Sequence, residues 1–306
     1  MANLKAIRKR ISSVKSTQKI TRAQKMVAGA RLTRAQHRIQ ALRPYAVKTA
    51  QVLSDVVGGN GDGESVSQDN AHPLLARRPE KTVLLLVITS DRGLCGAFNT
   101  NILRAASKIW HEREAAGQSV KIVTIGRKGR DFFRRRNAPV LEVLSGVWEK
   151  LDIEQARNIA RKVLAPFVKG DVDSVYVVYN EFKSAMSQRV VAEPLFPLSK
   201  PAAASNESTD ARETPEWAAK SEHLFEPDRG ALLERLVPMY VEVSILRALY
   251  ESQASELGSR MTAMESATKK AAEMIGKYTL IYNRARQAAI TTELMEIIGG
   301  AEALRS

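Results

Sequence analysis

Residues 250–292 read YESQASELGSRMTAMESATKKAAEMIGKYTLIYNRARQAAITT, and they carry the strongest periodicity in the chain. Thirteen positions spaced alternately four and three residues apart are apolar in eleven cases, when Ala and Tyr are counted as apolar. They are Tyr250, Ala254, Leu257, Met261, Met264, Thr268, Ala271, Ile275, Tyr278, Tyr282, Ala285, Ala289 and Thr292. Because no proline follows Pro238, the pattern predicts one coiled-coil helix over residues 228–303.

A helix of that length rises to ~110 Å at ~1.5 Å per residue. Such a helix exceeds any small globular core, so its apolar seam must be covered by another long helix. Residues 2–57 supply the candidate, because only Gly29 and Pro44 interrupt them before Gly58. The two helices are therefore predicted to pair in the antiparallel direction.

The seam predicted for residues 2–57 has three groups of apolar positions. They are Leu4, Ile7, Ile11 and Val14; then Ile20, Ala23, Val27 and Ala30; then Ile39, Leu42, Ala46, Ala50, Leu53 and Val57. The change of spacing between positions 14 and 20 predicts a phase skip, where the coiled coil would be overwound. Pro44 is predicted to kink or restart the helix.

Residues 81–199 change to alternating strand and helix patterns, which indicate a small α/β domain built from βαβ units. Strands are predicted at Thr82–Thr89, Val120–Ile125, Val140–Leu144, Val175–Tyr179 and Arg189–Phe196, and helices at Asn99–Ala116, Arg127–Arg136 and Ile153–Val168. The predicted organisation is a coiled-coil helix (1–57), a Gly-rich linker (58–80), the α/β domain (81–199), a low-complexity insertion (200–222) and a second coiled-coil helix (223–306).

The net charge of +14 is concentrated at the N-terminus, because residues 1–50 hold thirteen Lys and Arg and no Asp or Glu. Such a block predicts an acidic partner: nucleic acid, anionic lipid or an acidic protein surface. The longest aliphatic run has six residues, so no segment is predicted to cross a bilayer. We also expect no secretory signal, since the basic N-terminus has no apolar core.

The sequence offers no convincing catalytic or cofactor site. Ser90–Asn99 lies between a strand and a helix, where α/β folds bind ligands, but it lacks the G-x-G-x-x-G spacing, and no Walker A pattern occurs in the chain. Cys95 is the single cysteine and has no histidine placed beside it by sequence, and the four histidines lack metal-ligand spacing. We therefore expect a structural turn at Ser90–Asn99, and neither a metal nor a cofactor.

Three stretches of the sequence together resemble one family. Residues 6–21 (AIRKRISSVKSTQKIT) are similar to the N-terminal start of the gamma subunit of the F-type, rotary, proton-translocating ATP synthase. The Ser90–Asn99 turn resembles the central motif of that family, and residues 282–288 (YNRARQA) with 290–303 (ITTELMEIIGGAEA) resemble its C-terminal signature. The motifs cover both ends and the middle in the right order, and the resemblance favours a bacterial protein.

The resemblance implies an α/β fold with a long antiparallel coiled coil, in which the terminal helices pair and a Rossmann-like α/β domain is inserted between them. It implies the central rotor stalk, which couples proton flow through the membrane ring to ATP synthesis or hydrolysis. The implied partners are three alpha and three beta subunits, the epsilon subunit and the c-ring, with no nucleic acid. The chain would be a non-catalytic subunit, peripheral and held indirectly at the cytoplasmic face of the bacterial inner membrane.

The resemblance also implies two sets of functional residues. Polar positions that would contact beta-subunit loops are Arg260, Arg286, Gln287, Thr291 and Glu293. Basic positions of the shaft that would face acidic loops are Arg8, Lys9, Lys15, Lys19, Arg22 and Lys25. Gln24 stands where the family pattern has methionine, and the insertion at 200–222 has no cysteine for a thiol switch.

Two other functions remain as alternatives. A dinucleotide-binding α/β protein with helical arms would need a phosphate-binding loop and an acidic ribose ligand, and the sequence shows neither. A nucleic-acid-binding coiled coil would use the basic N-terminal block, but Tyr45 is the only aromatic residue among the first fifty.

Overall fold

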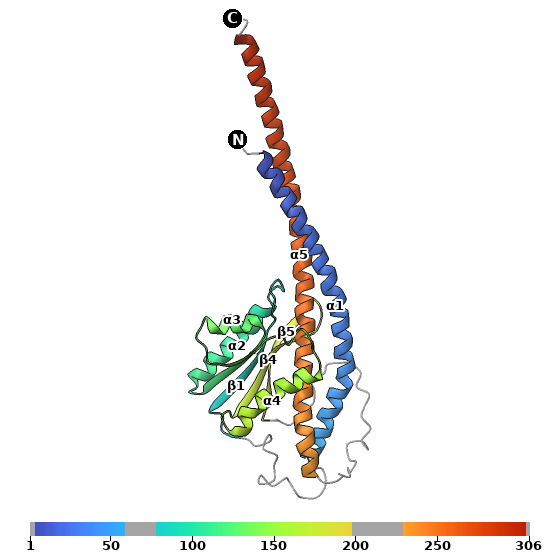
Figure 1. Cartoon of the computed structure of the whole chain (residues 1–306), viewed down its shortest axis with the longest axis vertical. Coiled ribbons are helices and arrows are strands. Elements are labelled where there is room, and N and C mark those ends of the chain that lie inside the picture. The colour runs from blue at the N-terminus through green and yellow to red at the C-terminus, as the bar shows by residue number, and fades with distance from the viewer. Residues whose placement is uncertain (1–3, 59–77, 198–228, 304–306) are drawn as a thin grey trace. The chain divides into compact units, whose positions relative to one another are not determined.

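The computed structural model describes residues 4–58, 78–197 and 229–303. The chain divides into two compact units. The first unit consists of the described residues of Met1–Arg31 and Arg260–Ser306, and the second of those of Leu32–Ser259. Two long helices, α1 (Leu4–Gly58) and α5 (Arg229–Ala303), contribute to both units (Figure 1). The linker and the insertion predicted at 58–80 and 200–222 lie almost entirely outside the described residues.

The second unit contains a five-stranded sheet in the order β3-β2-β1-β4-β5. Its strands are β1 (Thr82–Ile88), β2 (Ser119–Ile125), β3 (Val140–Leu144), β4 (Ser174–Phe182) and β5 (Gln188–Phe196). β1 to β4 run parallel, and β5 pairs antiparallel with β4 as a hairpin. The predicted strands are all present, and β4 extends three residues beyond its predicted end.

The sheet is covered by helices on both faces, as its continuous apolar strands predict. Alternate side chains of β1 point to opposite faces. Val83, Leu85 and Val87 pack with α2 (Phe98–Ala115) and α3 (Arg127–Arg134). Leu84, Leu86 and Ile88 pack with α4 (Ile153–Lys169), α5 and the end of α1 (Figure 1). The fold is therefore a three-layer α/β domain whose third layer includes parts of both long helices.

The seam predicted for α5 is confirmed. Twelve of its thirteen positions are buried or half-buried, from Tyr250 to Ala289, and only Thr292 is exposed. α5 is one helix that includes Pro238, and α1 is likewise one helix that includes Pro44. Of the two outcomes predicted for Pro44, a kink or a restart, the restart was therefore wrong. The ring lies on an exposed part of the helix, where water can satisfy the carbonyl that loses its donor.

The seam predicted for residues 20–30 of α1 was wrong, and there is no phase skip. The covered positions continue in steps of three and four through polar residues, while Ile20 and Val27 are 58% and 52% exposed. The regular series is Leu4, Ile7, Ile11, Val14, Gln18, Thr21, Lys25 and Ala28, followed in the second unit by Leu32, Ala35, Ile39, Leu42, Ala46, Thr49, Leu53 and Val56. The prediction was mistaken because the apolar residues Ile20 and Val27, which lie beside the seam, were taken as part of it.

No helix among the described residues is long and apolar enough to cross a membrane.

Gly126, between β2 and α3, should be the glycine that the α/β domain tolerates losing least. Its φ is +91°, and a Cβ there would lie 2.2 Å from the carbonyl oxygen of Thr89. Gly126→Ala should lower the free energy of unfolding by about 4 kcal/mol, because it adds a backbone clash to the strain. Gly117→Ala is the control, since Gly117 has φ +79° with nothing within 4 Å of the new Cβ. Urea unfolding of the full chain measures both, and equal losses would contradict this reading of Gly126.

Candidate functional site

Polar contacts hold the coiled coil of the first unit in one antiparallel register. Arg8 Nη2 donates to the Tyr282 hydroxyl at 3.3 Å, and its guanidinium carbon lies 5.8 Å from the centre of that ring. Further along α1, the hydroxyls of Thr21 and Thr268 are 2.8 Å apart. Positions rise along α1 as they fall along α5, so the pairing of these two segments is antiparallel, as predicted (Figure 1).

An ion pair fills the next layer of the seam. Lys25 Nζ lies 3.1 Å from Glu265 Oε1, and Lys269 approaches the same oxygen at 3.8 Å. The hydrogen bond from Lys25 lowers the pKa of Glu265 below its ordinary value. An ion pair this exposed contributes little to the stability of the fold. A polar layer within an apolar seam nevertheless fixes the register in which the two helices pair.

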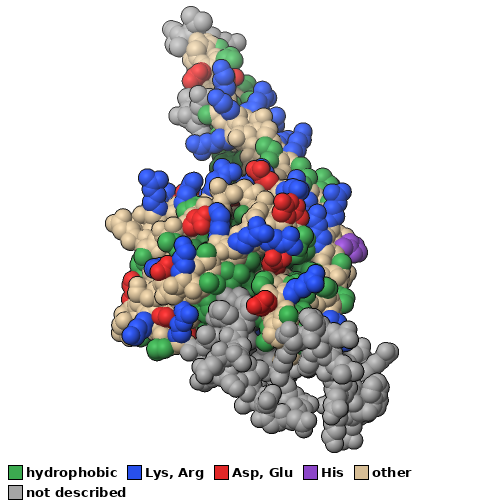
Figure 2. Space-filling model, turned by 60° about the horizontal axis from the view of Figure 1, so that its bottom comes forward, with side chains coloured by type: hydrophobic (Ala, Val, Ile, Leu, Met, Phe, Trp, Pro, Cys, Tyr) green, Lys and Arg blue, Asp and Glu red, His purple; other side chains and the backbone are tan. Residues whose placement is uncertain are grey.

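The basic positions predicted on α1 divide into two groups. Arg8 and Lys25 are engaged with α5, at Tyr282 and Glu265. The other four side chains are exposed, and these are Lys9, Lys15, Lys19 and Arg22. Residues 1–31 and 260–306 together hold sixteen Lys and Arg against five Glu. Figure 2 shows Lys and Arg side chains well in excess of Asp and Glu on the helices. These residues therefore carry most of the net positive charge of the chain.

The polar positions predicted near the end of α5 form an exposed group. Arg286, Gln287, Thr291 and Glu293 are all exposed, and the Thr291 hydroxyl donates to the Gln287 carbonyl at 3.0 Å. Arg260 is half-buried and lies 26 residues earlier, about 39 Å along the helix. The structure therefore brings four of the five together and leaves Arg260 apart.

The end of α5 also carries an apolar surface that the seam pattern did not reveal. Every described residue from 290 to 301 is exposed. The large apolar side chains among them are Ile290, Leu294, Met295, Ile297 and Ile298, which are 49–69% exposed. Since Arg8 lies at Tyr282, α1 begins too late to cover residues beyond about 290. The apolar positions of α5 continue to Ile298, beyond those that the predicted seam of α1 can match, and this difference was the signal that could have revealed the surface. Exposed apolar patches of this kind mark contacts with other molecules.

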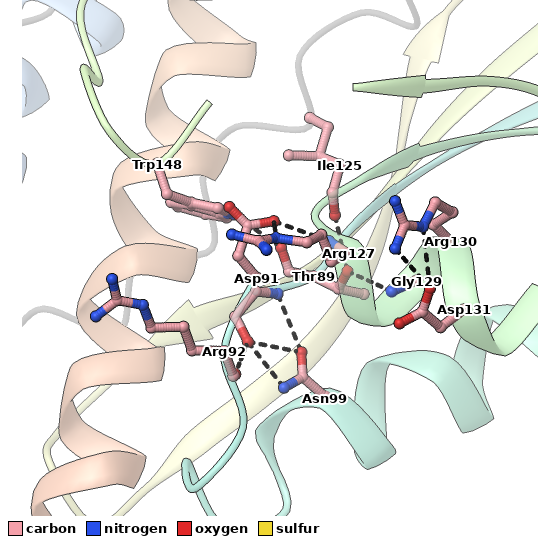
Figure 3. A network of polar contacts seen from close by, with 11 residues as sticks. Thr89, Asp91, Arg92, Asn99, Ile125, Arg127, Gly129, Arg130, Asp131 and Trp148 are labelled. Carbon is pink, nitrogen blue, oxygen red and sulfur yellow. Dashed lines mark hydrogen bonds and ion pairs between the residues drawn. The ribbon is translucent and has the colours of Figure 1, made fainter. Parts of the chain in front are cut away.

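The turn that follows β1 is built into the domain by hydrogen bonds (Figure 3). Asn99 Oδ1 accepts from the Ser90 amide at 3.0 Å, and Asn99 Nδ2 donates to Ser90 Oγ at 2.8 Å and to Cys95 Sγ at 3.2 Å. Cys95 is 2% exposed. Trp148 Nε1 donates to the Thr89 carbonyl at 2.9 Å. These contacts support the reading of Ser90–Asn99 as a structural turn.

The first amides of α3 lie at a helix N-terminus, where an anion could bind, but the protein itself supplies their acceptors. The Arg127 amide donates to Asp91 Oδ1 at 2.8 Å, and the Gly129 amide to Thr89 Oγ1 at 2.8 Å. The Lys128 amide donates to the Ser90 carbonyl at 3.2 Å. Figure 3 shows Asp91 and Thr89 filling this position. The N-terminus of α3 therefore has no free amide among these three for an anion, because each already has an acceptor.

A half-buried charged cluster lies where α5 packs on β4 and β5. Arg247 Nη2 contacts Glu193 Oε2 at 2.5 Å and the Tyr179 hydroxyl at 3.4 Å. Glu251 Oε2 is buried and has no hydrogen-bond partner among the described residues. Burial raises the pKa of Glu251 from 4.5 to about 7, with Glu181 and Glu193 adding to the shift and Arg247 and Arg43 opposing it. Sequence reasoning missed this cluster, because its members are far apart in the chain.

Known proteins match this chain over its whole length. A family model described as ATP synthase matches residues 3–304. Curated relatives named ATP synthase gamma chain cover 100% of both chains: one from Sorangium cellulosum (strain So ce56) is 58% identical over 322 aligned residues, and those from Anaeromyxobacter sp. (strain Fw109-5) and Geobacter sp. (strain M21) are 47% and 46% identical.

Solved structures match the fold at lower identity. A chain from the cryo-EM structure of Euglena gracilis mitochondrial ATP synthase (OSCP/F1/c-ring, rotational state 3) aligns with a TM-score of 0.66 at 19% identity, covering 98% of this chain and 94% of that one. A chain of the Tetrahymena thermophila mitochondrial central stalk and c-ring aligns with a TM-score of 0.58 at 24% identity, covering 81% of this chain and 99% of that one.

Glu251 should make the stability of the chain depend on pH. The folded state retains the proton up to about pH 7, whereas the unfolded state loses it near pH 4.5. The free energy of unfolding should therefore fall as pH rises from 4.5 to about 7, by about 3 kcal/mol in total. Urea unfolding of the full chain at pH 5 and pH 8 measures this loss.

Glu251→Gln should remove most of the decrease in the free energy of unfolding between pH 5 and pH 8. The variant should also be more stable than the wild type at pH 8. Glu234→Gln is the control, because Glu234 is an exposed carboxylate on the same helix. A Glu251→Gln chain that loses as much stability as the wild type between the two pH values would refute the role of Glu251.

Proposed function

We infer the function of this chain from its family: it belongs to the ATP synthase gamma-chain family, whose members match it from end to end. The chain is accordingly the gamma subunit of an ATP synthase. The observation that carries this conclusion is the full-length match to bacterial gamma chains, on a fold that pairs two terminal helices and inserts an α/β domain between them.

As the central stalk of the rotor, the chain couples proton flow to ATP synthesis or hydrolysis by turning inside a ring of three alpha and three beta subunits. The coiled coil of the first unit suits this role, because the end of α5 continues beyond the start of α1 as a single exposed helix. A shaft of unequal helices presents different surfaces in different directions. Its rotation would drive the beta subunits through their states in turn.

The contacts with the ring fall on exposed side chains. Arg286, Gln287, Thr291 and Glu293 are exposed and would hydrogen-bond to beta-subunit loops, and the half-buried Arg260 would make a separate contact elsewhere on α5. Exposed Lys9, Lys15, Lys19 and Arg22 would face acidic loops, as would the outer sides of Arg8 and Lys25. The charge surplus of this unit supports the proposal, because opposite charge steers and orients such contacts.

The subunit itself would be non-catalytic, with nucleotide chemistry left to the ring. The α3 amides that could have held phosphate are occupied by Asp91, Thr89 and Ser90. The α/β domain would lie near the epsilon subunit and the c-ring. The chain would be peripheral, held through the complex at the cytoplasmic face of the bacterial inner membrane.

The purified chain alone should show negligible ATPase activity, because its sequence has no phosphate-binding loop. In native membranes, a tag on the chain should co-purify alpha, beta, epsilon and c subunits. Turnover by the isolated chain, or a pull-down that lacks these subunits, would contradict the proposed role.

Arg286→Ala with Gln287→Ala should impair coupled ATP synthesis far more than folding. Both side chains are exposed, so the double substitution should change the free energy of unfolding by less than about 1 kcal/mol. Coupled synthesis in membrane vesicles should fall at least severalfold. Lys277→Ala is the control, because this exposed basic side chain lies nine residues before Arg286, about 14 Å along the helix, outside the predicted contact group. Equal losses from the double substitution and from Lys277→Ala would contradict a directed contact.

Charge reversal along α1 should have unequal effects. Single Lys→Glu or Arg→Glu changes at Lys9, Lys15, Lys19 and Arg22 place the same charge at four exposed positions. If the helix turns against acidic loops, a few changes should be severe and the rest mild, since solvent screens charges beyond about 8–10 Å. Equal, additive losses that follow nucleic-acid affinity, measured at physiological salt, would favour the nucleic-acid alternative.

A further inference from the structure

The C-terminal half of β4 has one edge that no strand covers, and this edge lies against α5. β1 pairs with β4 only as far as Val87 opposite Val178, and then leaves the sheet. β4 continues to Phe182, paired with β5 alone, from Tyr179 opposite Val191 to Phe182 opposite Gln188. The backbone groups on the other edge of this extension have no strand to bond with. Tyr179 and Asn180 are buried there, and Glu181 and Phe182 are half-buried.

Two serines of α5 take the place of the missing strand. Ser252 Oγ accepts from the Asn180 amide at 3.4 Å, and Ser255 Oγ donates to the Asn180 carbonyl at 3.1 Å. Both serines are 0% exposed, and Asn180 is 3% exposed. Because buried backbone groups are costly to leave unpaired, a shift of α5 along the sheet would break contacts that water cannot replace.

The next turn of α5 lies directly on the backbone of the β4–β5 hairpin. A Cβ at Gly258 would lie 3.2 Å from the Cα of Ala185, a tight contact that would push the hairpin away by a few tenths of an ångström. Ser259 Oγ donates to Gln188 Oε1 at 2.8 Å, and Gln188 Nε2 donates to the Ser184 and Ala185 carbonyls. The hairpin is thus fixed to the helix at its strand and at its turn.

The Arg247–Glu193 contact extends the same interface in the N-terminal direction along α5. Four successive turns of α5, from Arg247 to Ser259, are therefore attached to β4, β5 and their turn. The same helix then continues to Ala303 as part of the coiled coil. A force on the α/β domain reaches the coiled coil through this segment without crossing a loop.

We propose that α5 residues 247–259 and the β4–β5 hairpin form a rigid torque-bearing joint between the α/β domain and the shaft, with Ser252 and Ser255 as its positioning residues. The proposal rests on the rotor function inferred above. The joint stays closed throughout turnover. The α/β domain and α5 turn together because the polar contacts prevent sliding, while the flanking apolar core supplies the adhesion.

Loosening the joint should uncouple the complex. Ser252→Ala with Ser255→Ala removes both hydroxyls without adding volume. In the assembled complex, ATP hydrolysis should stay within about twofold of the wild type, whereas ATP-driven proton pumping and ATP synthesis should fall at least threefold. Ser266→Ala is the matched control, because Ser266 is an exposed serine on the same helix. Unchanged synthesis in the double variant would overturn the proposal. Should the double variant not assemble, each single variant is measured with the same expectation.

A second experiment tests the joint by locking it with a cross-link. Gln188→Cys with Ser259→Cys, in a Cys95→Ser background, allows a short reducible thiol cross-linker to span the contact. The cross-linked complex should retain ATP synthesis within about twofold, and the cross-link should restore coupling to the Ser252→Ala/Ser255→Ala chain. Synthesis that stops on cross-linking and returns on reduction would mean that the joint opens during turnover, and would refute the proposal.

The two proposals fail differently. If the rotor function were wrong, the wild-type chain itself would not support coupled synthesis in the complex. If only the joint were wrong, the wild type would be coupled while the loosened variant behaved identically or the locked variant failed.

Discussion

The seam of α5 needs a cover along most of its length, and α1 can supply it only in one direction and register. In the first unit that register is fixed by Arg8 against Tyr282, Thr21 against Thr268 and Lys25 against Glu265. In the second unit, Leu53 and Val56 of α1 share a core with Leu233 and Val237 of α5. Because α1 is the shorter helix, the same register leaves the end of α5 uncovered and available to partners.

The sequence predicted α5 well and part of α1 badly, for one physical reason. An apolar count recognises a seam only where its layers are apolar, as they are from Tyr250 to Met264. Between Gln18 and Lys25 the seam of α1 is polar, because its side chains bond across to α5 or back to their own helix, as Thr21 does to Gln18. The count therefore moved to Ile20 and Val27, which lie beside the seam.

In the α/β domain, features that depend on neighbouring residues could be predicted from the sequence, and contacts between distant residues could not. β1 could be predicted because its run from Thr82 to Ile88 is buried on both faces. The attachment of β4 to α5 could not, since Asn180 meets Ser252 and Ser255 across more than seventy residues. Likewise, the exposed polar group at Arg286 and Gln287 was predicted from resemblance, while the partner of Lys25 lies 240 positions away and became visible only in the structure.

Rotation of this chain within its complex is the most direct test of the central claim. Met186 lies in the hairpin turn and is 85% exposed, so Met186→Cys in a Cys95→Ser background can carry a visible probe while the alpha–beta ring is fixed to a surface. On addition of ATP, the probe should turn in one direction, with three equal steps per revolution if the ring holds the three beta subunits proposed above. A probe that stays still, or only fluctuates, while the same complexes hydrolyse ATP would contradict the rotor function.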